Sequence, residues 1–118
     1  MKDNLIRNKS FVFALRIVKL FQYLQQEKKE FVLSKQLLRS GTSIGAMVRE
    51  SEHAESKADF IHKLSIALKE ANESEYWIDL LYHSNYLDEK QYESIIADII
   101  ELKRIITAIL LSMKKKKS

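Results

Sequence analysis

The sequence contains no cysteine and no proline, and only two of its 118 residues are glycine. Without cysteine the chain forms no disulfide, no thiolate metal site and no cysteine nucleophile, which fits a reducing compartment. Without proline, and with so little glycine, few positions interrupt a helix. The composition therefore favours long helices joined by short turns.

Long apolar runs are also missing. The longest, residues 105–111, is interrupted by Thr107 and is far shorter than the roughly 20 residues that span a membrane. Residues 2–4 are Lys-Asp-Asn, and no apolar stretch of the kind found in signal peptides follows them. We therefore expect no membrane contact and no signal peptide. A hydrophobic content of 46% supplies enough apolar residues for one core.

The net charge of +4 is unevenly distributed along the chain. Residues 1–40 carry nine Lys and Arg against three Asp and Glu, residues 41–100 carry five against twelve, and residues 101–118 carry six against one. The first and last helices of an up-down-up-down bundle are neighbours. We therefore expect the positive charge to gather on one side, as a candidate surface for an anionic partner.

Hydrophobic periodicity predicts four helices, at about 10–28, 32–53, 56–84 and 89–113, followed by a basic tail at 114–118. Ser56 with Asp59, and Asp88 with Gln91, resemble the capping boxes that begin helices, and Asn85 is a plausible helix stop. No alternating strand pattern competes. The predicted fold is one all-α domain over residues 1–118, an antiparallel up-down-up-down four-helix bundle.

The first predicted helix carries two neighbouring apolar stripes. One contains Phe13, Ile17, Leu20 and Leu24, and the other contains Phe11, Leu15, Val18 and Phe21. Together they form an arc wider than one bundle seam needs. Deep burial is one explanation and a subunit interface is the other, so Phe11, Leu15 and Val18 are candidate interface residues.

Small residues gather in the second predicted helix. Ser40, Thr42, Ser43 and Ala46 surround Gly41, Ile44 and Gly45, and each glycine costs about 1 kcal/mol relative to alanine inside a helix. Both glycines lie here, four residues apart, so we expect another backbone to pass close by. A loop is the competing interpretation. Gly41, Ile44 and Gly45 are candidate residues for helix packing or for an interface.

The best metal-binding pattern is weak. Glu50 and His53 form a Glu-x-x-His motif, and Asp59 and His62 lie on the far side of one turn. Di-iron bundles instead place two such motifs and two further carboxylates inside the core. Here the pattern falls at one end of the predicted bundle, so we expect solvated charges and no metal or other cofactor.

Signals for catalysis are equally weak. Ser40, Thr42 and Ser43 have no nearby histidine and no nucleophile-elbow pattern around them. The two glycines are not followed by the Lys-Ser or Lys-Thr of a phosphate-binding loop. We expect a protein that is not an enzyme.

Basic residues on the first, second and fourth predicted helices, together with the tail, are candidates for binding nucleic-acid phosphate, which needs little more than clustered Lys and Arg. Lysine tails also serve solubility alone. Neither a recognition-helix motif nor an aromatic stacking platform is evident, so the expected binding is independent of sequence. The candidates are Arg16, Lys19, Lys35, Arg39, Lys103, Arg104, Lys114, Lys115, Lys116 and Lys117.

The run Lys-Gln-Leu-Leu-Arg-Ser-Gly-Thr-Ser-Ile-Gly-Ala at residues 35–46 resembles the four-helix-bundle proteins known as 23S rRNA-intervening-sequence proteins. The segment from Asp59 to Ile78 continues the resemblance, which covers nearly the whole chain. The family usually has Asn-x-x-Glu after Ser-Ile-Gly-Ala; here Met47 stands at the asparagine position, and Glu50 is kept.

This resemblance implies a bacterial cytoplasmic protein that forms a ring-shaped homo-oligomer, a pentamer. A related branch is the accessory variability determinant of diversity-generating retroelements, whose basic ring partners a reverse transcriptase and nucleic acid. Membership of the family does not by itself transfer that role.

Two functional hypotheses follow from the sequence. The leading one is a non-catalytic oligomeric protein that associates with RNA or DNA phosphate through a basic surface and the lysine tail. The alternative is a ring-shaped scaffold for protein–protein interaction with no nucleic-acid role.

Overall fold

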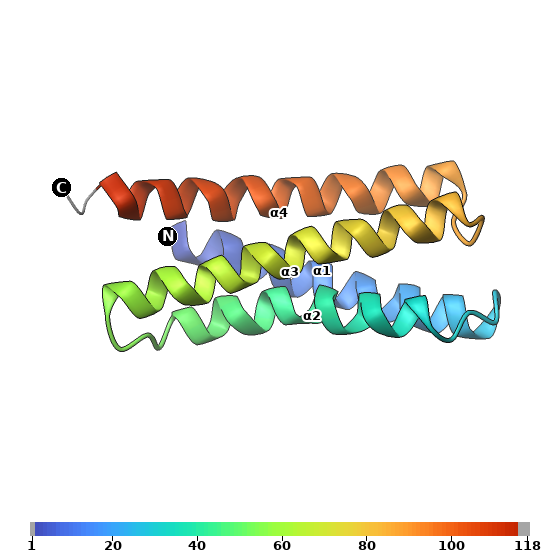
Figure 1. The fold of residues 1–118 in the computed structure, drawn as a ribbon, viewed down its shortest axis with the longest axis horizontal. Coiled ribbons are helices and arrows are strands. Elements are labelled where there is room, and N and C mark those ends of the chain that lie inside the picture. The colour runs from blue at the N-terminus through green and yellow to red at the C-terminus, as the bar shows by residue number, and fades with distance from the viewer. Residues whose placement is uncertain (1, 116–118) are drawn as a thin grey trace.

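A computed structural model describes residues 2–115 and contains four helices, α1 (Lys2–Gln26), α2 (Leu33–Ser51), α3 (Lys57–His83) and α4 (Glu89–Lys115). No strand occurs within that range, so the predicted all-α class with four helices is confirmed. Figure 1 shows the chain running along the long axis four times and reversing direction at each turn. The structure is elongated, with principal extents of 50 × 22 × 21 Å.

The start of the first helix was wrongly predicted. The sequence suggested about residue 10, but α1 begins at Lys2. Ser10 is buried and its hydroxyl donates to the carbonyl of Arg7 at 3.2 Å, so Ser10 lies within the helix and does not cap it. Ile6 is buried two turns before Phe13 and extends the same apolar face. Nothing between residues 2 and 10 interrupts a helix.

The other predicted boundaries differ from the observed ones by two residues or fewer. The first helix ends at Gln26, and α4 continues to Lys115, so Lys114 and Lys115 of the predicted tail are helical. Residues 116–118 of that tail lie outside the described residues. The segment with Gly41 and Gly45 is a continuous part of α2 and not a loop.

The core is formed by one apolar stripe from each helix. The α3 stripe includes Leu64, Ala67, Ala71, Ile78 and Leu81, all almost completely buried. Met47, at the family's usual asparagine position, packs against this core as an apolar side chain. The fully buried large side chains of the other helices are Phe13, Ile17, Leu24, Leu37, Ile44, Val48, Ile99, Leu102 and Ile106.

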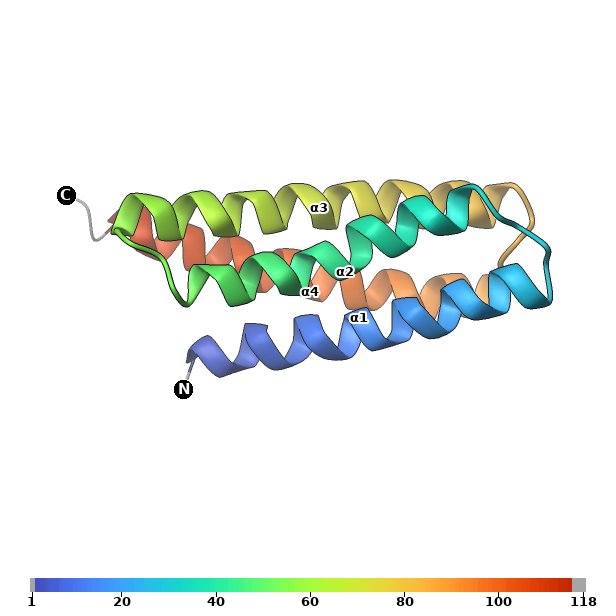
Figure 2. The same ribbon diagram turned by 90° about the horizontal axis from the view of Figure 1, so that it is seen from below.

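The small residues of α2 allow α1 to approach closely. A Cβ atom on Gly41 would lie 2.9 Å from Cγ1 of Ile17, and one on Gly45 would lie 3.4 Å from the backbone oxygen of Ser10. The expectation of a closely passing backbone is therefore confirmed. Seen from below, α1 runs alongside α2 over most of its length (Figure 2), whereas its contact with α4 is the weakest between neighbouring helices.

Two of the predicted helix caps are present. The hydroxyl of Ser56 accepts the backbone N–H of Asp59 at 3.0 Å. At the start of α4 the capping is reciprocal: Oδ1 of Asp88 accepts the N–H of Gln91 at 2.7 Å, and Oε1 of Gln91 accepts the N–H of Asp88 at 2.9 Å. These bonds satisfy N–H groups that have no partner inside the helix.

A third cap, not anticipated from the sequence, fixes the turn between α1 and α2. The buried carboxylate of Glu30 accepts backbone N–H groups of Val32 at 3.1 Å, Leu33 at 2.9 Å and Ser34 at 2.6 Å. The hydroxyl of Ser34 donates to the carbonyl of Glu30, and the N–H of Glu30 donates to the carbonyl of Leu24. This turn is therefore held from both helices.

The hydrogen bonds decide the pKa of Glu30. Burial by itself raises the pKa of the carboxyl, but the N–H groups of Leu33, Ser34 and Val32 stabilise the ionised form. The net effect lowers the pKa of Glu30 below its ordinary value. Glu30 therefore acts as an ionised cap at the N-terminal end of α2, where negative charge is favourable.

The two glycines of α2 should respond in opposite ways to alanine. In Gly41→Ala the new methyl group meets the stiff, fully buried Ile17, so we expect the free energy of unfolding to fall by about 1–2 kcal/mol. In Gly45→Ala the contact is ordinary, and the helix gains up to about 1 kcal/mol from the propensity of alanine. Urea unfolding of both variants checks this, and equal stability of Gly41→Ala and the parent would contradict the close packing.

Replacing Glu30 by glutamine should destabilise the chain in a pH-dependent way. At neutral pH we expect Glu30→Gln to lower the free energy of unfolding by about 1 kcal/mol. Because the pKa of Glu30 is lowered on folding, its stabilisation is complete above its unfolded pKa and is lost as the pH falls through the folded pKa. Denaturant unfolding from pH 7 downward should show the two proteins converging. The exposed Glu27→Gln is the matched control, and a difference that persists in acid would exclude the charged cap.

Candidate nucleic-acid interface and assembly face

Three of the ten candidate phosphate-binding residues are already paired with acidic residues of the same chain. Arg16 on α1 binds Asp98 on α4 and also donates to the hydroxyl of Ser94 at 2.9 Å. Lys103 on α4 lies 2.6 Å from the carboxylate of Glu75 on α3. These cations join helices, and their charge is largely compensated.

Arg39, the third of these residues, belongs to a polar cluster on α2 and α3. Its guanidinium contacts Glu70 at 3.2 Å and also binds Glu73, whose Oε2 accepts the indole N–H of Trp77 at 3.1 Å. The bonds from Trp77 and then Arg39 lower the pKa of Glu73. The hydrogen bond to Glu73 in turn raises the pKa of Arg39. Both shifts favour the charged forms of Arg39 and Glu73, so the two residues form a stable ion pair. A pair of this kind offers no group for proton transfer.

Four other candidates are exposed and have no acidic partner within residues 5–115: Lys19, Lys35, Arg104 and Lys114. Lys115 is also exposed, at the end of α4. Lys116 and Lys117 lie outside the described residues. The start of α2 and the end of α4 lie at opposite ends of the elongated bundle (Figure 1), so Lys35 and Lys114 are far apart. The structure therefore does not gather the ten candidates into one patch.

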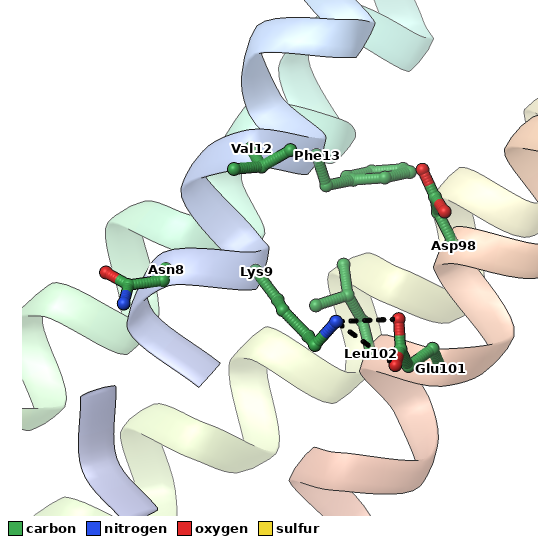
Figure 3. Close-up of a pocket in the computed structure, with 7 residues that line it drawn as sticks. All are labelled: Asn8, Lys9, Val12, Phe13, Asp98, Glu101 and Leu102. Atoms are coloured by element: carbon green, nitrogen blue, oxygen red, sulfur yellow. Dashed lines mark hydrogen bonds and ion pairs between the residues drawn. The ribbon is translucent and has the colours of Figure 1, made fainter. Parts of the chain in front are cut away.

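The side shared by α1 and α4 is not uniformly basic, because α4 presents acidic residues to α1. A groove of about 190 Å³ lies between the two helices, and in Figure 3 the amine of Lys9 reaches across it to Glu101. The Lys9–Glu101 distance is 3.2 Å, and Asp98 lies on the same wall, close to the ring of Phe13. The groove thus contains compensated charges and apolar walls. Its described lining includes no serine, threonine or histidine.

Sequence reasoning missed a basic group at the turn between α1 and α2. Lys28 and Lys29 are exposed beside Phe31 and Val32, whose exposed fractions are 51% and 69%, and Lys35 follows one turn into α2. The sequence Lys-Lys-Glu-Phe-Val at residues 28–32 could have indicated this basic group. It was missed because Lys28 was assigned to the end of the first predicted helix. We call residues 27–35 the α1–α2 turn.

The outward side of α1 carries five exposed apolar side chains, with the polar residues Asn8 and Lys19 exposed among them. Leu5, Phe11, Val12, Leu15 and Val18 have exposed fractions between 37% and 56%, and we call these five residues the α1 face. Phe11 is contacted by Arg49, whose guanidinium carbon lies 5.3 Å from the ring centroid. Phe11, Leu15 and Val18 are therefore available for an interface, as the width of the apolar arc suggested.

The remaining interface candidates have a role inside the subunit. Ile44 is completely buried, and Gly41 and Gly45 lie under α1. They hold α1 against α2, which is the helix-packing alternative given for them above. Gly45 is partly exposed and lines a pocket together with Phe11 of α1.

The Glu-x-x-His pattern does not form a metal site in the described part of the chain. Glu50 contacts Lys63 at 3.2 Å, and His53 is exposed beyond the end of α2. Among the side chains of residues 5–115, no three of His, Asp or Glu are grouped so that they could hold a metal ion. The described helices also include none that is long and apolar enough to cross a membrane.

The fold and these surfaces define a class of all-α four-helix-bundle proteins with an exposed apolar helix face and scattered cations. A family model described as 23S rRNA-intervening sequence protein matches residues 2–108. The chain therefore belongs to the 23S rRNA-intervening sequence protein family, as the resemblance of residues 35–46 predicted. A comparison with curated proteins gave no match.

A solved structure shares both the fold and much of the sequence. It is the crystal structure of a protein of unknown function from the S23 ribosomal protein family of Bacteroides thetaiotaomicron VPI-5482. The two chains are 57% identical, with a TM-score of 0.92, and the match covers 93% of this chain and 98% of the other.

Proposed function

We propose that this chain is a non-catalytic protein that assembles into a homo-oligomer and associates with RNA or DNA through phosphate contacts. Each copy in this homo-oligomer is an antiparallel up-down-up-down four-helix bundle. The observation that carries the proposal is the α1 face, which the subunit leaves uncovered. The exposed cations without an acidic partner support the other part of the proposal, which is association with nucleic acid.

The α1 face supports assembly because of its size and its spacing. Phe11, Leu15 and Val18 follow one another at helical intervals of four and three residues, and Leu5 and Val12 extend the same exposed side. Monomeric proteins rarely leave contiguous apolar patches of this kind in water, and large ones mark interaction sites. A second copy of the chain that covers this face would remove it from solvent.

A closed ring is the form of assembly that we propose, with five copies as the family resemblance implies. In a ring, the α1 face of one copy covers a different surface of the next copy, so the contact joins unlike surfaces. Such head-to-tail contacts close into rings when the rotation between neighbours allows it. The resemblance noted for the sequence also implies a relation to the accessory variability determinant, whose basic ring would be a precedent.

Association with nucleic acid is supported by the charges that remain after the internal ion pairs are formed. Lys19, Lys35, Arg104 and Lys114 are exposed without an acidic partner in the described residues, and repetition around a ring multiplies them. Phosphate contacts of this kind are electrostatic and largely independent of base sequence.

The alternative function is a protein–protein scaffold whose lysines only maintain solubility. The α1 face supports this alternative equally well, since it is apolar and carries no phosphate-binding group. The two functions differ in one observable property, which is salt-sensitive binding to nucleic acid by the assembled protein.

A charge placed in the α1 face should disrupt the assembly. We expect Leu15→Lys to shift the mass in solution from an oligomer, about five copies if the ring is a pentamer, toward the 13.9 kDa single chain. The half-exposed position of Leu15 leaves folding almost unchanged. Light scattering after size-exclusion chromatography measures this, with Tyr76→Lys on the exposed side of α3 as the control. A parent protein that is monomeric at micromolar concentration would overturn the assembly.

The unpaired cations should contribute to nucleic-acid binding more than the paired ones. We expect the double variant Lys19→Ala/Arg104→Ala to weaken binding and to reduce the slope of log K against log salt by about 0.9 for each phosphate that is no longer bound. Arg39→Ala should leave binding unchanged and cost less than about 1 kcal/mol of stability, since its ion pairs are half-exposed.

The measurement is a fluorescence anisotropy titration with structured RNA and duplex DNA at two salt concentrations. A chain that ends at Met113 should bind more weakly than the full chain, because it lacks the terminal lysines. Absence of binding at low salt would exclude the nucleic-acid function and favour the scaffold.

A further inference from the structure

The α1–α2 turn presents two apolar side chains to solvent from a rigid backbone. Three N–H groups bind the carboxylate of Glu30, which fixes the backbone of Val32, Leu33 and Ser34. Phe31 and Val32 lie between this anchor and α2 and are more than half exposed. The backbone that carries this apolar pair is therefore held in place before any partner binds.

The charge on this turn is positive. Lys28, Lys29 and Lys35 are exposed and have no acidic partner within residues 5–115. Glu30 faces its backbone donors, so Glu27 is the one exposed carboxylate between residues 27 and 35.

The neighbouring turn at the same end of the bundle is acidic. It carries Asp88 and Glu89 against Lys90, and Asp88 is engaged by the N–H of Gln91 (Figure 1). The exposed cations of the two turns therefore lie mainly on the α1–α2 turn, near Phe31 in the sequence.

An exposed aromatic ring on a turn with three exposed lysines matches the chemistry of a nucleotide with a free base. The face of a base stacks on an aromatic ring in proteins that bind single strands, and Lys or Arg side chains bind the flanking phosphates. In a duplex the base faces are stacked on one another, which hides them from Phe31. A lipid surface fits less well, because membrane binding scales with buried apolar area and this turn offers two side chains.

We propose that the α1–α2 turn binds an unpaired nucleotide of single-stranded nucleic acid, with Phe31 stacked on the base and Lys28, Lys29 and Lys35 on the adjacent phosphates. This inference rests on the proposed association with nucleic acid and gives it a contact point and a preference for single strands. Because Glu30 fixes the turn in the free protein, little conformational entropy is lost on binding. In an oligomer, each copy contributes one such turn.

The test separates stacking from general apolar contact and from charge. Single-stranded RNA of about 12 nucleotides, and a duplex of the same length, are titrated with the assembled full chain by fluorescence anisotropy. Phe31→Leu keeps an apolar side chain and removes the aromatic face, whereas Phe31→Trp keeps the aromatic face. Tyr76→Leu, at an exposed aromatic position on α3, is the matched control. Light scattering verifies that all variants keep the mass of the parent.

We expect Phe31→Leu to weaken single-strand binding about tenfold and to leave duplex binding unchanged. Phe31→Trp should bind the single strand at least as tightly as the parent, and Tyr76→Leu should behave as the parent. Lys28→Ala/Lys29→Ala should weaken binding to both nucleic acids and reduce the dependence on salt.

Tryptophan fluorescence provides an independent readout. In Phe31→Trp, stacking on a base should quench the new tryptophan when the single strand is added, and Tyr76→Trp should show no such quenching. Single-strand binding that Phe31→Leu does not weaken would overturn this inference and leave the proposed function standing. Failure of the parent to bind any nucleic acid at low salt would overturn both. Binding to phosphatidylserine vesicles that depends on Phe31, without single-strand binding, would replace the nucleotide with a lipid surface.

Discussion

The close approach of α1 to α2 at Gly41 and Gly45 is the constraint on which the rest of the structure depends. Ile17 packs tightly over Gly41, and the carbonyl of Ser10 lies in ordinary contact range of Gly45, so α1 is held with this side against α2. This orientation buries Phe13 and Ile17 in the core and turns Phe11, Leu15 and Val18 outward. The exposed apolar face is thus a consequence of how α1 is held, since α2 offers a narrow groove of small residues and α4 covers α1 only weakly.

The orientation of α1 also determines which of its cations are paired with acidic residues and which remain free to bind an anion. It points Lys9 and Arg16 toward α4, whose Glu101 and Asp98 compensate them. Exposed ion pairs of this kind contribute little stability, so their main effect here is on the surface potential. They compensate two cations on the side where α1 and α4 meet, and within the described residues they leave unpaired cations at Lys19, at Arg104, on the α1–α2 turn and at Lys114. A charge count along the sequence does not reveal this, because it assigns no partners.

Much of the fold followed from the sequence, and the reasons for success and failure are specific. The hydrophobic periodicity of α3 and the capping residues Ser56 and Asp88 are local signals, and the structure contains the elements they predicted. The start of α1 was misplaced because its apolar stripes were followed only from Phe11 and Phe13 onward, whereas the buried Ile6 continues the core-facing stripe toward Lys2. The ion pairs of Arg16, Arg39 and Lys103 depend on how helices are rotated against each other, which hydrophobic periodicity alone does not specify. The role of Glu30 was hidden for a related reason, since only the folded turn brings three N–H groups to one carboxylate.

The two ends of the bundle are chemically different, and this has a consequence for any assembly with a single rotation axis. The end of α4, with Lys114 and Lys115, lies at one end, and the α1–α2 turn, with Phe31, lies at the other (Figure 1). Copies related by one rotation axis that runs along the bundles all point the same way. Such a ring is a two-sided particle, with the Phe31 turns on one rim and the ends of α4, with Lys114 and Lys115, on the opposite rim. A nucleic-acid strand that contacted both rims would meet different groups at each, so its two orientations in the ring would not be equivalent.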